Sequence, residues 1–305
     1  MPRIPRDHFV PKAYLRGFTV EYLAGKKGGL LFVHHPGLGW VHRLSINDYV
    51  ACEPEFYDNH PIDKHWSQTI EQSWPTVRTE LKNKEISPEL LDALFWFVAA
   101  QFIRTPRFMN FVGRKLSLQE ARIKERTFEG RRIKGMYLGM ADTGEIMDEV
   151  TRFWPIARQT LEADYTWTIY HRSYSHFFLT SDDPCQLDLK TNRLVMPLAL
   201  DLAIVGEVVP DGTAPSIHHS NASPDLIAKI KRSIVGGCDS RVYAYADTPE
   251  LRCFMKKNHV DRDIMLCGRD FSNDGKPMTD DEIDNLMKDF ERLRAKDRAK
   301  ESVSK

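Results

Sequence analysis

The stretch that decides the fold is FFLTSDDP at 177–184, where an apolar run stops at a polar cluster and a proline. An apolar run with aromatic residues is typical of a buried strand, and a Ser-Asp-Asp-Pro cluster is typical of the loop that leaves it. Loops at strand ends commonly carry functional side chains on a rigid scaffold. The sequence therefore predicts a strand from His176 to Thr180, with a candidate site at its end.

More strand-like segments lie on both sides of this run. Four of them follow the same apolar and β-branched pattern, at 166–170, 194–196, 202–205 and 241–245. The connections are too short for crossover helices, so these strands are expected to be neighbours in an antiparallel sheet. Nearer the N-terminus, the segments 30–33 and 40–44 flank Pro-Gly-Leu-Gly, which predicts a β-hairpin.

The middle of the chain has helical spacing instead. Ser87-Pro88 is a helix-start signal, and the segment 90–109 is apolar on nearly every side, which predicts a buried central helix interrupted near Pro106. Ser223-Pro224 and Thr248-Pro249 start two more helices. The fold class predicted is therefore α+β. One domain is expected over 1–278, with a helical segment at about 63–164 and a sheet mainly at 165–246, followed by a charged terminal helix at 279–305.

Composition limits the classes of partner. The 305 residues are 42% hydrophobic and carry a formal net charge of zero, so no global field draws the chain to nucleic acid or membrane. No stretch resembles a membrane span or a secretion signal, which predicts a cytoplasmic protein without a membrane partner. The five cysteines lack metal-site spacing and are expected to be free thiols. A basic segment at 104–134 holds ten Lys and Arg against three Glu, a candidate surface for nucleic acid.

Several residues have side chains suited to chemistry. His8, before a short apolar helix, is a candidate general base or ligand, or else a surface or capping residue. Glu71 lies beside apolar neighbours on a helix, where the alternative is a solvated carboxylate. Arg104 ends the most apolar helix and needs an anionic partner, either a protein carboxylate such as Glu71 or Asp182 or a ligand anion. Asp182 and Asp183 can bind a divalent cation, orient a histidine or cap a turn.

In their order along the chain, these motifs resemble a mainly bacterial family known as domain of unknown function 4238. The resemblance covers about residues 8 to 246, and the matching positions are His8, Pro11, Tyr14, Leu15, Phe56, Tyr57, Glu71, Gln101, Arg104, Thr105, Pro106, Thr180, Ser181, Asp182 and Pro184. The family carries no assigned activity. The resemblance implies that His8, Glu71, Gln101, Arg104 and Asp182 converge in the folded protein.

The leading functional hypothesis is a hydrolase of phosphate esters, such as a metal-dependent nuclease. Its catalytic set would be His8, Glu71, Gln101, Arg104, Ser181 and Asp182, with Glu71 and Asp182 holding Mg²⁺ or Mn²⁺. The basic segment 104–134 would contact the nucleic-acid backbone. A second hypothesis is a non-enzymatic binding module for an anionic ligand or nucleic acid, in which the buried polar cluster is structural. A third is an assembly protein that uses the segment 279–300 as an oligomer contact.

Overall fold

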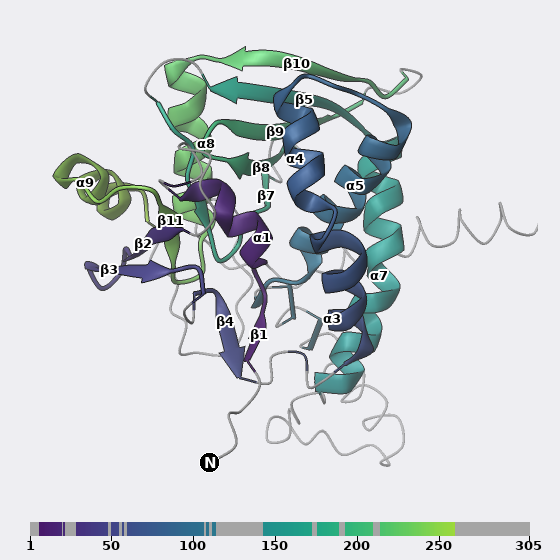
Figure 1. Ribbon diagram of the computed structural model, residues 1–305, viewed down its shortest axis with the longest axis horizontal. Coiled ribbons are helices and arrows are strands. Elements are labelled where there is room, and N and C mark those ends of the chain that lie inside the picture. The colour runs from purple at the N-terminus through teal and green to yellow at the C-terminus, as the bar shows by residue number, and fades with distance from the viewer. Residues whose placement is uncertain are drawn as a thin grey trace, which may run out of the picture.

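The protein is built from helices and three β-sheets (Figure 1). The computed structural model describes residues 6–19, 21, 29–47, 50–54, 57, 60–106, 108–109, 112–113, 143–172, 176–188, 193–209 and 214–259. Most of the basic segment 104–134 and the whole charged segment 279–305 therefore lie outside the described residues, as does a strand expectation at Phe56.

The largest sheet has five strands in the order β10-β5-β9-β8-β7. Its members are β5 (Tyr165–Arg172), β7 (Gln186–Asp188), β8 (Arg193–Ala199), β9 (Leu202–Val208) and β10 (Ile217–Ala222). The pairs along β5, β9, β8 and β7 are antiparallel, whereas β10 runs parallel to β5. The register between β8 and β9 shifts between Pro197 and Ala199.

A four-stranded antiparallel sheet has the order β3-β2-β11-β6. It contains β2 (Leu30–His35), β3 (Trp40–Ser45), β6 (Thr180–Ser181) and β11 (Val242–Ala244). A two-stranded sheet pairs β1 (Arg6–His8) with β4 (Cys52–Pro54). The predicted hairpin is thus confirmed as β2 and β3, joined by a turn at Pro36–Gly39.

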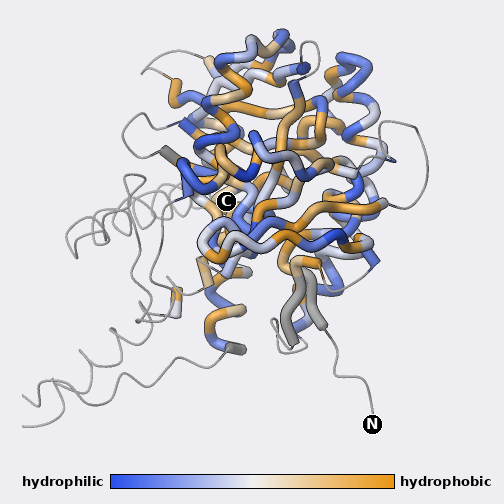
Figure 2. Tube along the Cα trace, turned by 90° about the vertical axis from the view of Figure 1, so that its left-hand side faces the viewer, coloured by the Kyte–Doolittle hydropathy of each residue, from blue (hydrophilic) through white to orange (hydrophobic). Residues whose placement is uncertain are grey.

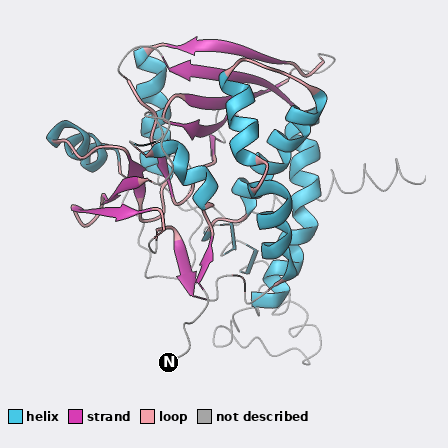
Figure 3. Cartoon of the chain, viewed as in Figure 1, coloured by secondary structure: helices cyan, strands magenta, loops and turns pink. Residues whose placement is uncertain are grey.

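The helices gather along one side of the molecule, next to the largest sheet (Figure 3). In chain order they are α1 (Lys12–Leu15), the 3-10 turn η1 (Arg16–Phe18), α3 (Pro61–His65), the π-helix η2 (Trp66–Glu71), α4 (Trp74–Lys82), α5 (Pro88–Ile103) and α7 (Thr143–Ala163). Two later helices, α8 (Pro224–Gly237) and α9 (Pro249–Asn258), lie on the opposite side (Figure 1). The Ser-Pro and Thr-Pro start signals are confirmed, because Ser87, Ser223 and Thr248 each accept a hydrogen bond from the third residue after them.

The five-stranded sheet is covered on both faces, and apolar residues line the interior (Figure 2). In β8, Leu194 and Met196 pack toward α5 and the other helices of the larger core, whereas Val195 packs toward α8 in a second core cluster. In β9, Ile204 and Val205 divide between the two clusters in the same way. Successive side chains of a strand point to opposite faces, so a strand buried on both sides becomes apolar at every position.

The α+β class predicted from the sequence is confirmed, but two details differ. The run at 176–180 forms a strand only at Thr180–Ser181, and it pairs with β11 in the four-stranded sheet, so both this run and the expected strand at 241–245 lie outside the sheet of β5, β8 and β9. Strand β10, with the sequence IHHSNA, has little apolar character and was not expected from its sequence. Whether such a segment becomes a strand or remains a loop depends on whether a neighbouring strand pairs with it, and the local sequence pattern does not determine that.

Candidate functional site

The first polar site is a buried network around Arg104. The guanidinium Nη1 donates to Glu71 Oε1 at 2.6 Å, and Nε donates to Tyr57 Oη at 2.9 Å. The Arg104 side chain is 1% exposed and that of Glu71 is 19% exposed. The carboxylate partner that a buried arginine requires is therefore supplied by the protein itself, from the last residue of η2.

Aromatic rings enclose the guanidinium. Arg104 Cζ lies 5.1 Å from the centre of the Trp66 ring and 5.6 Å from that of Tyr57. Burial alone would lower the pKa of Arg104, but Tyr57 and Glu71 outweigh it and raise that pKa above its usual value. Burial raises the pKa of Tyr57, against the opposing effect of Arg104. The network therefore holds a charged arginine and a neutral tyrosine over the whole physiological range.

Gln101 lies one helical turn before Arg104 on α5 and is fully buried. Neither its amide nitrogen nor its amide oxygen has a hydrogen-bond partner within the described part of the chain, and the same holds for Trp66 Nε1 and Trp74 Nε1. Trp74 stacks on Phe97, one turn before Gln101, at a centroid distance of 3.7 Å. A buried amide that lacks partners is uncommon and marks a site of interest. The π-helix η2, which contains Trp66, is a second such mark, because π-helical turns are frequent at functional sites.

The second polar site is the carboxylate of Asp182, which is 2% exposed. Oδ1 accepts from Asp239 N at 2.9 Å, while Oδ2 accepts from Ser240 N at 2.7 Å, Ser240 Oγ at 3.0 Å and Arg241 N at 2.8 Å. Burial, with a smaller effect of the nearby Asp239 carboxylate, raises the pKa of Asp182 to about 7, although the donated hydrogen bonds oppose it. Asp182 thereby ties the loop between α8 and β11 to the end of β6.

The residues beside Asp182 are also held by local bonds. Ser181 Oγ donates to the backbone oxygen of Asp183 at 2.7 Å, and Gln186 Nε2 donates to the same oxygen at 2.6 Å. Thr180 shares a 2.7 Å hydrogen bond with Tyr14 Oη, which also donates to the Pro197 oxygen at 2.6 Å. These bonds join β6 to α1 and β8 and give the FFLTSDDP stretch a structural role.

The predicted site residues fall into separate groups. Glu71 and Arg104 are in contact, and Gln101 belongs to the same helix face, whereas Ser181 and Asp182 bond to their own loop and to residues 239–241. No hydrogen bond or ion pair among the described residues joins Asp182 to Glu71 or Arg104. The backbone of His8 pairs with Cys52 in the two-stranded sheet, and the His8 side chain lies outside the described residues.

Sequence reasoning gave no site role to Tyr57, Trp66 or the loop 239–241. Tyr57 is one of the positions that match the family pattern, as Arg104 is, and this shared match was the signal that could have indicated a site role for Tyr57. The loop 239–241 contributes backbone N–H groups, which any residue except proline supplies, so no residue type marks it in the sequence. Over the residues described, no group of three or more His, Cys, Asp or Glu is placed to hold a metal ion.

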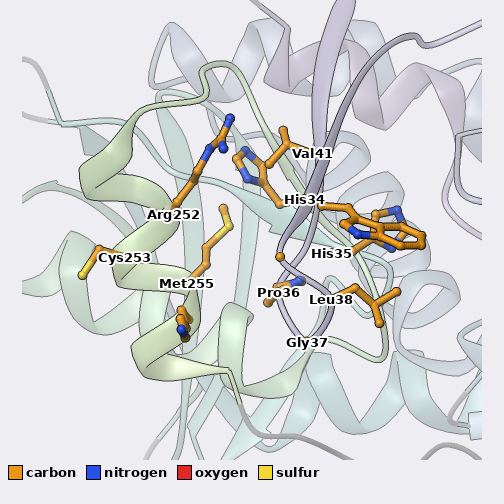
Figure 4. Close-up of a pocket in the computed structure, with 12 residues that line it drawn as sticks. His34, His35, Pro36, Gly37, Leu38, Val41, Arg252, Cys253 and Met255 are labelled. Carbon is orange, nitrogen blue, oxygen red and sulfur yellow. The ribbon is translucent and has the colours of Figure 1, made fainter.

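A pocket of about 490 Å³ lies between the β2–β3 turn and α9 (Figure 4). His34, His35 and Leu38 form the hairpin wall, and Arg252 and Met255 form the helix wall, as Figure 4 shows. The remaining lining residues are Pro36, Gly37, Gly39, Trp40, Val41, Cys253 and Lys256. The lining includes basic and imidazole side chains and, among the described residues, no Asp or Glu. The pocket is large enough for a ligand of ordinary small-molecule size.

Several features shape this pocket. Leu38 and Trp40 are 64% and 61% exposed. Arg252 forms an ion pair with Asp247, which orients its guanidinium. Burial is the main cause that lowers the pKa of both His34 and His35, so both imidazoles are neutral at pH 7 and the positive charge comes from α9.

The fold and these sites define an α+β protein with a central sheet covered on both faces and two buried polar clusters that pin its loops. The chain belongs to the family described as Protein of unknown function (DUF4238), which matches residues 6–244. Searches of the curated proteins and of the solved structures each returned no match. No helix within the described ranges is long and apolar enough to cross a membrane.

Proposed function

We propose that the protein is a non-enzymatic binding module for an anionic ligand, which binds in the pocket between the β2–β3 turn and α9. The observation that carries this proposal is the pocket lining, where Arg252, Lys256 and two histidines face a volume of about 490 Å³ without a lining carboxylate among the described residues. Asp247 balances the charge of Arg252, whereas Lys256 forms no ion pair with a described residue, so the Lys256 ammonium group supplies the positive field that attracts an anion to this concave site.

The buried clusters support a structural role for the residues that the hydrolase hypothesis would use. Arg104 already has a carboxylate at 2.6 Å and is 1% exposed, so a substrate phosphate reaches it only if Glu71 moves away. Asp182 accepts four hydrogen bonds from residues 239–241, which occupy the oxygen atoms that a metal ion would need. In this proposal, both clusters stabilise the fold that presents the pocket.

The chemistry of binding follows from the two walls. Lys256 is an exposed ammonium group on α9, and Arg252 presents a guanidinium that Asp247 holds in place. These groups would contact the negative charge of the ligand, while neutral His35 offers a hydrogen bond and the exposed Trp40 ring offers an apolar face. Phosphate-bearing ligands with a flat ring, including nucleotides and single-stranded nucleic acid, fit this combination.

The test is isothermal titration calorimetry at low ionic strength with pyrophosphate, a mononucleotide and a short single-stranded oligonucleotide. We expect Lys256→Ala to weaken binding about tenfold, since a charge-assisted contact contributes about 1.5 kcal/mol. The matched control is Lys257→Ala, because Lys257 is exposed on the same helix but does not line the pocket. Equal losses for both variants, or no binding by the wild-type protein, would contradict the proposal.

A hydrolase of phosphate esters is the second candidate, favoured by one observation. The π-helix η2 ends at Glu71, which contacts Arg104, and one helical turn before Arg104 the buried Gln101 amide has no partner in the described part of the chain. This candidate requires Glu71 and Asp182, which belong to separate groups in the structure, to come together to hold Mg²⁺ or Mn²⁺. Arg104 would stabilise the phosphate, and Gln101, Ser181 and His8 would complete the set. The basic segment 104–134 would then guide nucleic acid to the site.

The two candidates separate in an activity assay. Purified protein is incubated with RNA, DNA and nucleotides in the presence of Mg²⁺ or Mn²⁺, alongside His8→Ala and Glu71→Gln. Hydrolysis that both variants abolish, while their melting temperatures stay near the wild-type value, would support the hydrolase and displace the binding module. No hydrolysis under any condition, together with pocket-dependent anion binding, would support the binding module.

A further inference from the structure

We propose a second ligand site in the groove between α8 and α9, which binds a small aromatic carboxylic acid through an ion pair between its carboxylate and Lys231 Nζ. This site is separate from the anion pocket and does not depend on the function proposed above. The groove encloses about 400 Å³, which is within the range of small-molecule sites.

Lys231 belongs to the side of α8 that faces the groove. Pro224, Ile227, Ala228 and Lys231 all line it, and their spacing of three, four and seven residues places them on one helix face. Ile227 is part of the apolar cluster under α8. The aliphatic stem of Lys231 therefore runs along an apolar wall, with its ammonium group at the groove.

The ammonium group of Lys231 lacks an anionic partner among the described residues. Burial lowers the pKa of Lys231, which means that the protein surroundings do not repay the cost of desolvating its charge. Glu250 also lines the groove, but its carboxylate accepts hydrogen bonds from its own backbone N–H and from Thr248 at the start of α9. A ligand carboxylate would supply the missing counter-charge.

The groove also has aromatic walls, since Phe177, Tyr245 and Phe254 line it beside Leu251. Phe177 contacts both the Arg172 guanidinium, whose Cζ lies 4.3 Å from the Phe177 ring centre, and the Tyr245 ring, whose centroid lies 4.5 Å away. Phe254 of α9 lines the opposite wall. Aromatic rings pack well in offset or edge-to-face geometry, so these walls favour a ligand with an aromatic ring over one that is wholly aliphatic or polar.

The experiment measures binding of 3-phenylpropionate to the full chain by calorimetry, with 3-phenylpropanamide as the neutral analogue. The acid should bind and the amide should bind at least tenfold more weakly, because only the acid can pair with the ammonium group. Lys231→Met, which keeps the length of the stem and removes the charge, should reduce acid binding by at least tenfold. Lys229→Met is the matched control, since Lys229 is exposed on the same helix and does not line the groove.

Three results would overturn the inference: equal affinity for acid and amide, an unchanged affinity in Lys231→Met, or the same loss in Lys229→Met. Absence of wild-type binding at millimolar acid would also overturn it. If Lys231→Met fails to fold, as judged by its melting curve, Lys231→Arg takes its place and should retain acid binding over amide binding. Binding of phosphate-bearing anions to the pocket that contains Lys256 is measured in a separate titration. Absence of binding at one site therefore does not affect the test of the other.

Discussion

At the scale of single residues, the Arg104 network shows how a buried charge is tolerated. Its side chain is 1% exposed, yet the Glu71 carboxylate, the Tyr57 phenol and the Trp66 ring surround its guanidinium. A buried ion pair contributes little net stability over an apolar replacement, but removing one partner leaves the other charge buried and uncompensated. The network therefore makes the fold sensitive to loss of either charge.

We expect Arg104→Ala to lower the free energy of unfolding by about 3–5 kcal/mol, because Glu71 would lose its counter-charge and Tyr57 its donor. Urea unfolding followed by circular dichroism measures this change. The control is Arg152→Ala, which removes an exposed i,i+3 ion pair with Glu149 on α7 and should cost less than about 1 kcal/mol. Similar effects of the two substitutions would mean that the Arg104 network is not structural.

At the scale of elements, Asp182 connects the end of β6 to the loop between α8 and β11. Three backbone N–H groups of residues 239–241 have this carboxylate as their acceptor, so the loop conformation depends on it. Gly237, at the end of α8, adds a second constraint, since a Cβ there would lie 1.8 Å from Gln186 Oε1. The path from α8 to β11 is thus set by contacts to the β6–β7 region.

The raised pKa of Asp182 predicts a dependence of stability on pH. Its folded value of about 7 exceeds the reference value of 3.8, so the folded state binds more protons between these values and its stability falls as pH rises through this window. At about 1.4 kcal/mol per pKa unit, the effect amounts to a few kcal/mol. Wild-type stability should therefore decline from pH 4 to pH 7 relative to Asp182→Asn. The free energy of unfolding of each protein is measured by urea unfolding at each pH. If the two free energies change in parallel with pH, Asp182 does not have the raised pKa.

At the scale of the whole molecule, the two core clusters share the strands β8 and β9. Leu194 and Val195 are adjacent in β8 and contribute to different clusters. Loss of packing in one cluster therefore removes support from a strand on which the other cluster also packs. This arrangement favours unfolding as one cooperative unit. The prediction of a single domain over residues 1–278 rests on these shared strands.

We expect one thermal transition, with the same midpoint for two local probes. Tryptophan fluorescence reports mainly on the larger core cluster, which contains Trp66, Trp74 and Trp167, while the buried thiol of Cys238 reports on the cluster under α8. Thiol labelling during the melt should follow the fluorescence curve. Labelling of Cys238 at a lower temperature than the fluorescence change would instead indicate two units that unfold separately.

The sequence by itself determined the type and place of most elements. Helical periodicity and the Ser-Pro and Thr-Pro start signals located α5, α8 and α9, and the turn at 36–39 located the hairpin, because these features depend on neighbours only a few residues away. It also indicated that Arg104 needs an anion, since an arginine in an apolar helix has no other way to keep its charge.

Only the tertiary structure decided which groups meet. Glu71 and Arg104 are 33 residues apart, and Asp182 takes its donors from a loop 57 to 59 residues further on. The FFLTSDDP stretch was placed in the four-stranded sheet by its pairing with β11, and β10 became a strand by lying parallel to β5. Such choices depend on long-range packing and on backbone donors, which leave no local pattern in the sequence.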